Sequence, residues 1–211
     1  MIKALIFDLD NCLAPATQVG EALYQPAFEA IRISNDGTLS NDRLEESFEA
    51  VWSNAFDWVA DQYRYTPAMR RAGWERFAFL KVSHPMNGYS DLATLEQIEQ
   101  DCFLVTSGFR RLQESKIDAL GIRKRFRATF IDAIDEPERT SKQAIFQRIL
   151  EDFQIAPDET LVIGDNPHSE IAAGNRLGIQ TIQTLRPGIA KSVEACSHIH
   201  SLDELVDPLQ R

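Results

Sequence analysis

The sequence predicts an α/β fold in which a parallel sheet is flanked by helices and carries a helical segment inserted after its first strand. Three observations lead to this prediction. Short apolar runs recur along the chain, helical patterns separate most of them, and one long segment, residues 15–90, contains helical patterns but no convincing strand. Strands that alternate with helices are typical of a parallel α/β sheet.

The strongest strand signals are continuous apolar runs bounded by polar residues. They cover residues 4–7, 102–105 and 160–163. A run of this kind, with no alternation of polar residues, is typical of a strand buried on both faces of a parallel sheet. Weaker runs predict further strands at residues 128–131, 180–182 and 198–199.

Amphipathic patterns predict the helices that connect these strands. Residues 109–120 form one pattern, and Gly121 follows it as a stop signal. Residues 141–153 form a second, in which the apolar residues recur on one face. A shorter pattern at residues 169–177 is closed by Gly178.

The inserted segment has its own helical patterns. Residues 42–62 carry apolar residues at helical spacing, and residues 67–81 follow a proline suited to a helix start. Pro26 is expected at the start or at a kink of another helix. We therefore predict a catalytic core formed by residues 1–14 and 91–211, and a helical subdomain formed by residues 15–90.

Composition limits the classes of partner. The chain has 211 residues, 44% of them hydrophobic, and a formal net charge of −10. An acidic surface argues against nucleic acid as a main partner, because such binding depends on neutralising phosphates. No apolar stretch approaches the length of a membrane span. The three cysteines form no close pair, and no secretory signal precedes the first strand, so we expect a cytoplasmic protein. The sequence does not indicate an oligomeric state.

Polar residues follow each strong strand signal. The first strand is followed by Asp8 and Asp10, the second ends near Thr106 and Ser107, and a third precedes Asp165. Ligands of parallel α/β sheets bind outside the carboxyl ends of the strands, so these residues are expected to meet. Lys142, at the start of the helix 141–153, and Asn166 add a cation and an amide to the same region.

These residue types fit phosphoryl transfer. Asp8 and Asp165 offer the oxygen ligands that Mg²⁺ prefers, and Asp8 is a suitable nucleophile for forming an aspartyl-phosphate. Asp10 is placed to protonate the leaving oxygen and then to activate water. Thr106 and Lys142 are expected to hold the phosphoryl oxygens. Taken alone, each of these positions is more often part of a turn, a helix cap or the solvated surface, so the prediction depends on all of them occurring in order.

Four segments resemble the motifs of the haloacid dehalogenase-like hydrolase superfamily. Its hhhhDxDxT motif resembles residues 5–12, and its Thr or Ser after an apolar strand resembles Thr106. Its helix-opening Lys resembles Lys142, and its GDxxxxD motif resembles residues 164–170. The resemblance covers nearly the whole chain and implies a Rossmann-like core. The position and helicity of the insert resemble the C1-type cap of that superfamily.

The resemblance implies a role for each motif position. Asp8 is expected to be the nucleophile and Asp10 the general acid and base. The resemblance also implies a magnesium ion held by the Asp8 side chain, the Asp10 backbone carbonyl and Asp165. It implies phosphate binding by Thr106, Lys142 and backbone amides near Ser107. Asn166 and Glu170 are possible supporting residues.

Three positions depart from the superfamily pattern. Cys12 stands where Thr is usual, Glu170 where a second Asp is usual, and Gln143 where Pro often follows the lysine. A thiol is a weak donor, and a glutamate is one methylene longer than an aspartate. We expect Cys12 to cause a small loss of activity without abolishing it, Glu170 to contact the metal through water, and Gln143 to matter little.

The predicted function is magnesium-dependent hydrolysis of a small phosphorylated metabolite. A dehalogenase or phosphomutase of the same superfamily, or a non-catalytic binding protein on the same fold, remains an alternative. Asp10 favours phosphate chemistry over dehalogenation, because an alkoxide leaving group needs a proton and a halide does not.

Overall fold

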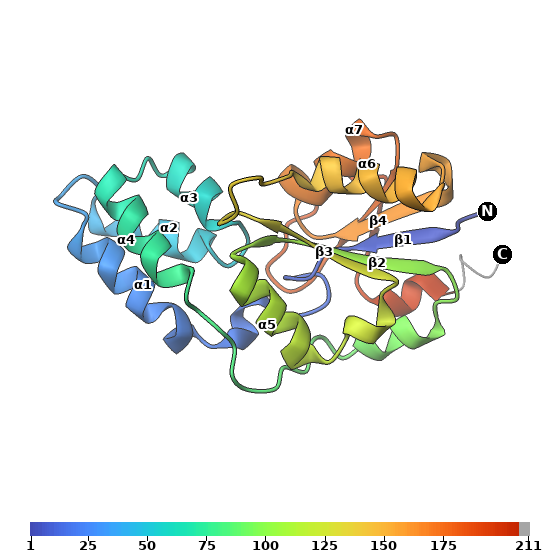
Figure 1. The fold of residues 1–211 in the computed structure, drawn as a ribbon, viewed down its shortest axis with the longest axis horizontal. Helices are drawn as coiled ribbons and strands as arrows, with labels where there is room; N and C mark the ends of the chain where they lie inside the picture. Colours follow the sequence, from blue (N-terminus) through green and yellow to red (C-terminus); the bar gives the residue numbers. More distant parts are fainter. Residues whose placement is uncertain (207–211) are drawn as a thin grey trace.

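The computed structural model describes residues 1–206 and contains two lobes, of which the larger is built on a parallel sheet (Figure 1). The predicted core domain extends to residue 211, so its last five residues lie outside the described part. The six strands lie in the order β3-β2-β1-β4-β5-β6, and every neighbouring pair is parallel. In chain order they are β1 (Ala4–Phe7), β2 (Asp101–Gly108), β3 (Ala128–Ala133), β4 (Thr160–Gly164), β5 (Gln180–Thr184) and β6 (Ser197–Ile199). The predicted α/β fold class is therefore correct.

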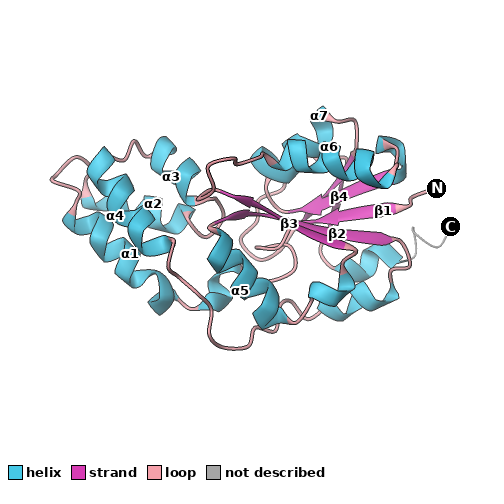
Figure 2. Cartoon of the chain, in the orientation of Figure 1, coloured by secondary structure: helices cyan, strands magenta, loops and turns pink. Residues whose placement is uncertain are grey.

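Helices cover both faces of this sheet (Figure 2). They are α5 (Arg110–Leu120), α6 (Lys142–Phe153) and α7 (Ala172–Arg176). Leu5 and Phe7 of β1 pack in the same cluster as Ile117 of α5, whereas Ala4 and Ile6 pack with residues of α6 and α7. Successive residues of β1 point to opposite faces of the sheet, and both faces are covered by apolar clusters. This is why β1 is a continuous apolar run.

The smaller lobe consists of four helices inserted between β1 and β2. They are α1 (Glu21–Ile33), α2 (Asn41–Ala50), α3 (Phe56–Gln62) and α4 (Pro67–Phe77). Their aromatic side chains form a separate apolar cluster, which also takes in Phe109 and Leu112 from the start of α5. The ring of Phe109 stacks on Phe77 with the centroids 5.8 Å apart, so this contact joins the two lobes. We refer to residues 15–90, the range predicted from the sequence, as the helical insert.

Two helix predictions need correction, and a third is narrowed. The pattern at 42–62 is interrupted, since α2 ends at Ala50 and α3 begins at Phe56. Pro26, expected at a helix start or at a kink, lies inside α1, which excludes the start. The pattern at 169–177 is divided between a π-helical turn, Pro167–Ile171, and α7. Periodicity detects which face of a segment is buried, but it does not detect a break that tertiary contacts impose.

The arrangement of the sheet places the strand ends beside the insert. The chain leaves β1 for β2 and β3 on one side and later returns to β4, β5 and β6 on the other side. The order therefore reverses at β1, and such a reversal opens a crevice at the carboxyl ends of the strands. These ends point toward the insert in Figure 1. Among residues 1–206, no helix is long and apolar enough to cross a membrane.

Candidate active site

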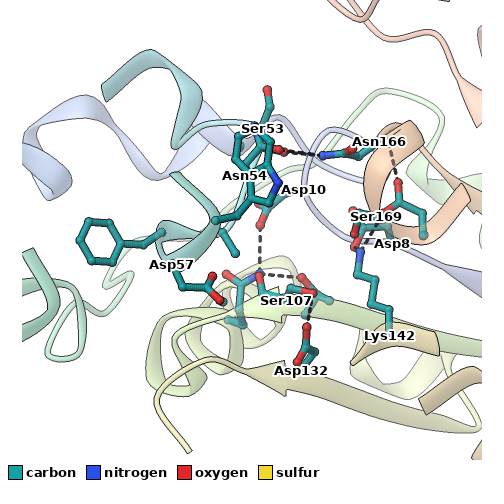
Figure 3. Close-up of a pocket in the computed structure, with 18 of the residues that line it drawn as sticks. Asp8, Asp10, Ser53, Asn54, Asp57, Ser107, Asp132, Lys142, Asn166 and Ser169 are labelled. Atoms are coloured by element: carbon teal, nitrogen blue, oxygen red, sulfur yellow. Dashed lines mark hydrogen bonds and ion pairs between the residues drawn. The ribbon is translucent and has the colours of Figure 1, made fainter. Parts of the chain in front are cut away.

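One cavity of about 360 Å³ lies at the strand ends, and residues of both lobes line it. All eight residues singled out from the sequence are among them: Asp8, Asp10, Thr106, Ser107, Lys142, Asp165, Asn166 and Glu170. Figure 3 shows several of these side chains converging from separate elements. The structure thus brings the eight residues together around one cavity.

A tight turn after β1 fixes the two aspartates. The backbone N–H of Asp8 donates to the carbonyl oxygen of Ile163 on β4, at 2.9 Å. Asn11 has a positive φ of 55°, and its N–H donates to the carbonyl oxygen of Ala14 at 2.7 Å. Asparagine tolerates this left-handed conformation better than most residues do. The turn leaves Asp8 buried at the sheet edge and directs the chain into the insert.

Lys142 joins the proposed nucleophile to Glu170. Its Nζ lies 2.7 Å from Oδ1 of Asp8 and 2.9 Å from Oε2 of Glu170, and all three side chains are buried. Lys142 is the first residue of α6, whose N-terminus is capped by the Ser141 hydroxyl. Burial lowers the pKa of Lys142, but the two carboxylates outweigh that effect and raise it. The ammonium therefore stays charged at the floor of the cavity.

Three buried carboxylates form the acidic centre of the site. Oxygen atoms of Asp8, Asp165 and Glu170 all lie within 4.8 Å of one another. Burial raises the pKa of Asp8 to about 7 even though the charge of Lys142 opposes this. Burial, together with the charges of Glu170 and Asp8, also raises the pKa of Asp165. One ammonium does not balance three carboxylates, so this oxygen-only set fits a divalent cation such as Mg²⁺.

Glu170 reaches this centre because the chain leaves space for it. Its Oε1 accepts a hydrogen bond of 2.6 Å from the backbone N–H of Asn166. Gly164 has no Cβ, and a Cβ at that position would overlap the side chain of Glu170. Glu170 can therefore pack in this position only because residue 164 is a glycine.

Asp10 lies outside the carboxylate centre and has different partners. Nζ of Lys116 lies 2.9 Å from Oδ1 and 2.8 Å from Oδ2, and Nε2 of Gln113 lies 3.0 Å from Oδ2. The same Nε2 is 2.6 Å from the hydroxyl of Thr106. Gln113 and Lys116 thus connect the carboxylate of Asp10 to the predicted phosphate-binding strand end.

The insert covers the cavity through the segment 52–54. The side-chain amide of Asn11 donates to the carbonyl oxygen of Trp52 at 2.9 Å. The amide of Asn166 donates to the carbonyl oxygen of Ser53 at 2.9 Å and to the side chain of Asn54 at 3.1 Å (Figure 3). The ring of Trp52 stacks on Tyr24 with the centroids 4.5 Å apart. In this position the insert lies over Asp8.

A second connection between the lobes passes through Arg139. Its Nε and Nη2 donate to the two oxygens of Asp132 at 2.7 and 3.0 Å, and its Nη1 pairs with Asp57 of α3. Asp132 is buried at the end of β3 and also accepts a hydrogen bond of 2.9 Å from the hydroxyl of Ser107. Ser107 is therefore held against Asp132 at the cavity wall.

The sequence analysis did not find several of these residues. They are Asn11, Asp57, Gln113, Lys116, Asp132 and Arg139. A signal existed for Gln113 and Lys116, because these polar residues lie on the buried stripe of α5 beside Leu112 and Ile117. A buried polar residue on an apolar helix face needs a partner.

Comparison with known proteins identifies the family. A sequence profile of haloacid dehalogenase-like hydrolases matches residues 2–178. The glyceraldehyde 3-phosphate phosphatase of Methanopyrus kandleri is 26% identical over 208 residues, covering 88% of this chain and 85% of that protein. The enolase-phosphatase E1 of a Sulfurihydrogenibium species is 23% identical, covering 97% of this chain and 98% of that protein.

Solved structures agree on the fold. The magnesium-bound YfnB protein of Bacillus subtilis superposes with a TM-score of 0.66 at 19% identity, over 100% of this chain and 99% of that chain. CbbY of Rhodobacter sphaeroides, solved with phosphate, gives a TM-score of 0.65 at 16% identity and covers 100% of each chain. At these identities the similarity concerns the fold alone.

Proposed function

Because the chain belongs to the haloacid dehalogenase-like hydrolase family, we propose that it is a magnesium-dependent phosphatase of small phosphomonoesters with Asp8 as its nucleophile. That it is a hydrolase follows from the family. The phosphatase names of its curated relatives support phosphate esters as substrates. The observation that carries the proposal is the buried group of Asp8, Asp165, Glu170 and Lys142 at the sheet edge.

The proposed metal site uses the oxygen atoms of that group. Asp8, Asp165 and the backbone carbonyl of Asp10 would hold Mg²⁺, with Glu170 and Asn166 as supporting residues. Bound there, Mg²⁺ would reduce the repulsion between an anionic nucleophile and an anionic phosphate. The carboxyl group of Asp10 takes no part in this site, since Lys116 and Gln113 hold it.

The reaction proceeds in two steps on this arrangement. The carboxylate of Asp8 attacks phosphorus, the bond to the leaving oxygen breaks, and Asp10 gives a proton to that oxygen. Asp10 then removes a proton from water, which attacks the aspartyl-phosphate and restores the Asp8 carboxylate. Lys142 orients Asp8 and stabilises charge on the phosphoryl oxygens together with Thr106 and the amides near Ser107.

Turnover of p-nitrophenyl phosphate tests this proposal. We expect hydrolysis with Mg²⁺ and none with EDTA, and we expect Asp8→Asn to lower kcat by about 10³-fold or more. Asp118→Asn, which changes an exposed aspartate on α5, is the matched control and should keep full activity. Acid quenching during turnover should yield a phosphorylated peptide that contains Asp8.

The outcomes also separate the alternatives. Metal-independent turnover, or full activity of Asp8→Asn, would refute the proposed mechanism. No turnover of this ester or of a panel of metabolite phosphates that includes glyceraldehyde 3-phosphate would favour a non-catalytic binding protein. Release of halide from a 2-haloacid would identify a dehalogenase, and conversion between two phosphate esters would identify a mutase.

A further inference from the structure

The positive charges that line the cavity are already paired with carboxylates, apart from one exposed arginine. Four side chains bring a positive charge to its lining: Lys116, Arg139, Lys142 and Arg176. Lys142 pairs with Asp8 and Glu170, and Lys116 pairs with Asp10. Arg139 pairs with both Asp132 and Asp57. Arg176 is exposed, where solvent screens its charge.

The insert supplies no cation to this cavity. Among the described residues that line it, those from the insert are aromatic, small, neutral polar or acidic. The acidic ones are Asp57 and Asp61, and the aromatic ones include the stacked pair Tyr24 and Trp52. A desolvated carboxylate or phosphate needs a positive or hydrogen-bond-donating partner, and a neighbouring carboxylate repels it. The wall that faces the leaving group is therefore unfavourable for a second anion.

Asp57 keeps Arg139 from serving such an anion. The guanidinium makes two parallel hydrogen bonds to Asp132, and its remaining terminal nitrogen pairs with Asp57. Two carboxylates on one guanidinium leave the group with a net negative charge. The second oxygen of Asp57, Oδ1, is buried and has no hydrogen-bond partner among residues 1–206. The carboxylate of Asp57, which lines the cavity, can only accept hydrogen bonds, so it suits a hydroxyl group and not an anion.

We propose that the substrate is a phosphomonoester of an uncharged, hydroxyl-bearing alcohol, and that Asp57 is a specificity-determining residue that excludes substrates with a second carboxylate or phosphate. This inference rests on the proposed phosphatase function and concerns the leaving-group side of the same cavity. The hydroxyl of the alcohol donates to Asp57, while the aromatic side chains of the insert cover its carbon skeleton. A second anionic group is repelled by Asp57, and Arg139 is not free to pair with it because it already pairs with two carboxylates.

Two probes of similar size test the proposal, because they differ in one group. Glycerol 1-phosphate carries a terminal hydroxymethyl group where 3-phosphoglycerate carries a carboxylate. The protein should hydrolyse glycerol 1-phosphate with a kcat/KM at least about tenfold higher. Asp57→Asn removes one carboxylate from Arg139. It should shift the ratio of the two kcat/KM values toward 3-phosphoglycerate by about tenfold or more. Glu45→Gln removes a charge elsewhere on the insert, where Glu45 pairs with Arg32, and should leave the ratio unchanged.

A measurement on the unmodified protein tests the proposal even if Asp57→Asn does not fold. Raising the salt concentration screens charge repulsion and should increase the relative turnover of 3-phosphoglycerate by the unmodified protein. Equal kcat/KM values for the two probes, or a ratio that neither Asp57→Asn nor salt changes, would overturn the inference. In that case turnover of p-nitrophenyl phosphate with Mg²⁺ would still stand. Failure of that reaction would instead overturn the phosphatase proposal itself.

Discussion

The ammonium group of Lys116 lies 2.9 and 2.8 Å from the two carboxylate oxygens of Asp10, so the proposed general acid shares a partly buried ion pair with α5. Tyr24 of the insert lines the same cavity as Lys116. Burial lowers the pKa of Lys116, but the charge of Asp10 outweighs this and raises it. We therefore expect Lys116 to act as a positioning residue for Asp10, the proposed proton-transfer group.

The first prediction concerns the dependence on leaving group. Lys116→Met should lower kcat for glycerol 1-phosphate by about 10²-fold or more, and lower kcat for p-nitrophenyl phosphate much less. The reason is that an alkoxide needs the proton that a well-placed Asp10 supplies, whereas p-nitrophenolate leaves without one. Lys116→Arg keeps the charge and should restore part of the difference. An equal loss on both substrates would show that Lys116 only supports the structure.

The second prediction concerns magnesium affinity. Gly164→Ala places a Cβ against Glu170 and should displace that carboxylate, which weakens Mg²⁺ binding by about 10- to 100-fold. Gly174→Ala is the matched control, because its Cβ would press on Thr181 and Val162, away from Glu170. Titration calorimetry with Mg²⁺ measures both variants. Unchanged affinity in Gly164→Ala would argue against Glu170 as a supporting residue.

The third prediction concerns a buried ion pair that fixes the turn after β1. Nη1 and Nη2 of Arg186 lie 2.7 and 3.1 Å from the oxygens of Asp91, and Arg186 also donates to the carbonyl oxygen of Cys12. Arg186→Met leaves Asp91 unpaired and should lower the free energy of unfolding by about 3–5 kcal/mol. Urea denaturation measures this loss. Arg123→Met, at an exposed pair, should cost at most about 1 kcal/mol.

The same pair gives a pH dependence. Burial opposes the charged form of Asp91, but the hydrogen bonds from Arg186 and from the N–H of Leu202 lower its pKa below the ordinary value. The stabilisation is therefore present above the ordinary aspartate pKa and is lost as pH falls through the lowered one. In Arg186→Met, the part of the decrease in unfolding free energy at acid pH that comes from Asp91 should disappear. An unchanged dependence of the unfolding free energy on acid pH would contradict this assignment.

The fourth prediction concerns thiol reactivity. Burial, reinforced by the charge of Asp101, raises the pKa of Cys102 to about 12, and burial raises the pKa of Cys12. Cys196 is exposed. At pH 8 the folded protein should therefore react with Ellman's reagent at one fast site, which Cys196→Ser removes. The other two thiols should react only on unfolding, and a second fast thiol in the native protein would contradict this.

The strands were predictable because each strong one is buried on both faces. That burial requires a continuous apolar run, and it left a recognisable pattern at β1, β2 and β4. The break between α2 and α3 left no such pattern. It falls at the segment 52–54, which instead makes contacts with Asn11 and Asn166 of the other lobe. Contacts between segments so far apart in the sequence are invisible to local periodicity.

The candidate site also has some features that the sequence predicts and others that it does not. The sequence by itself determined that Asp8, Asp10, Thr106 and Asp165 lie at or just beyond strand ends and that Lys142 opens a helix, and parallel strands bring such positions to one edge. Only the tertiary structure decided which charges pair there. Lys116 meets Asp10, and Arg139 links Asp57 to Asp132, because a charge buried by packing must find an opposite charge within reach. The packing of α5 on the sheet sets the first pair, the docking of the helical insert sets the contact of Asp57, and no spacing along the chain records either.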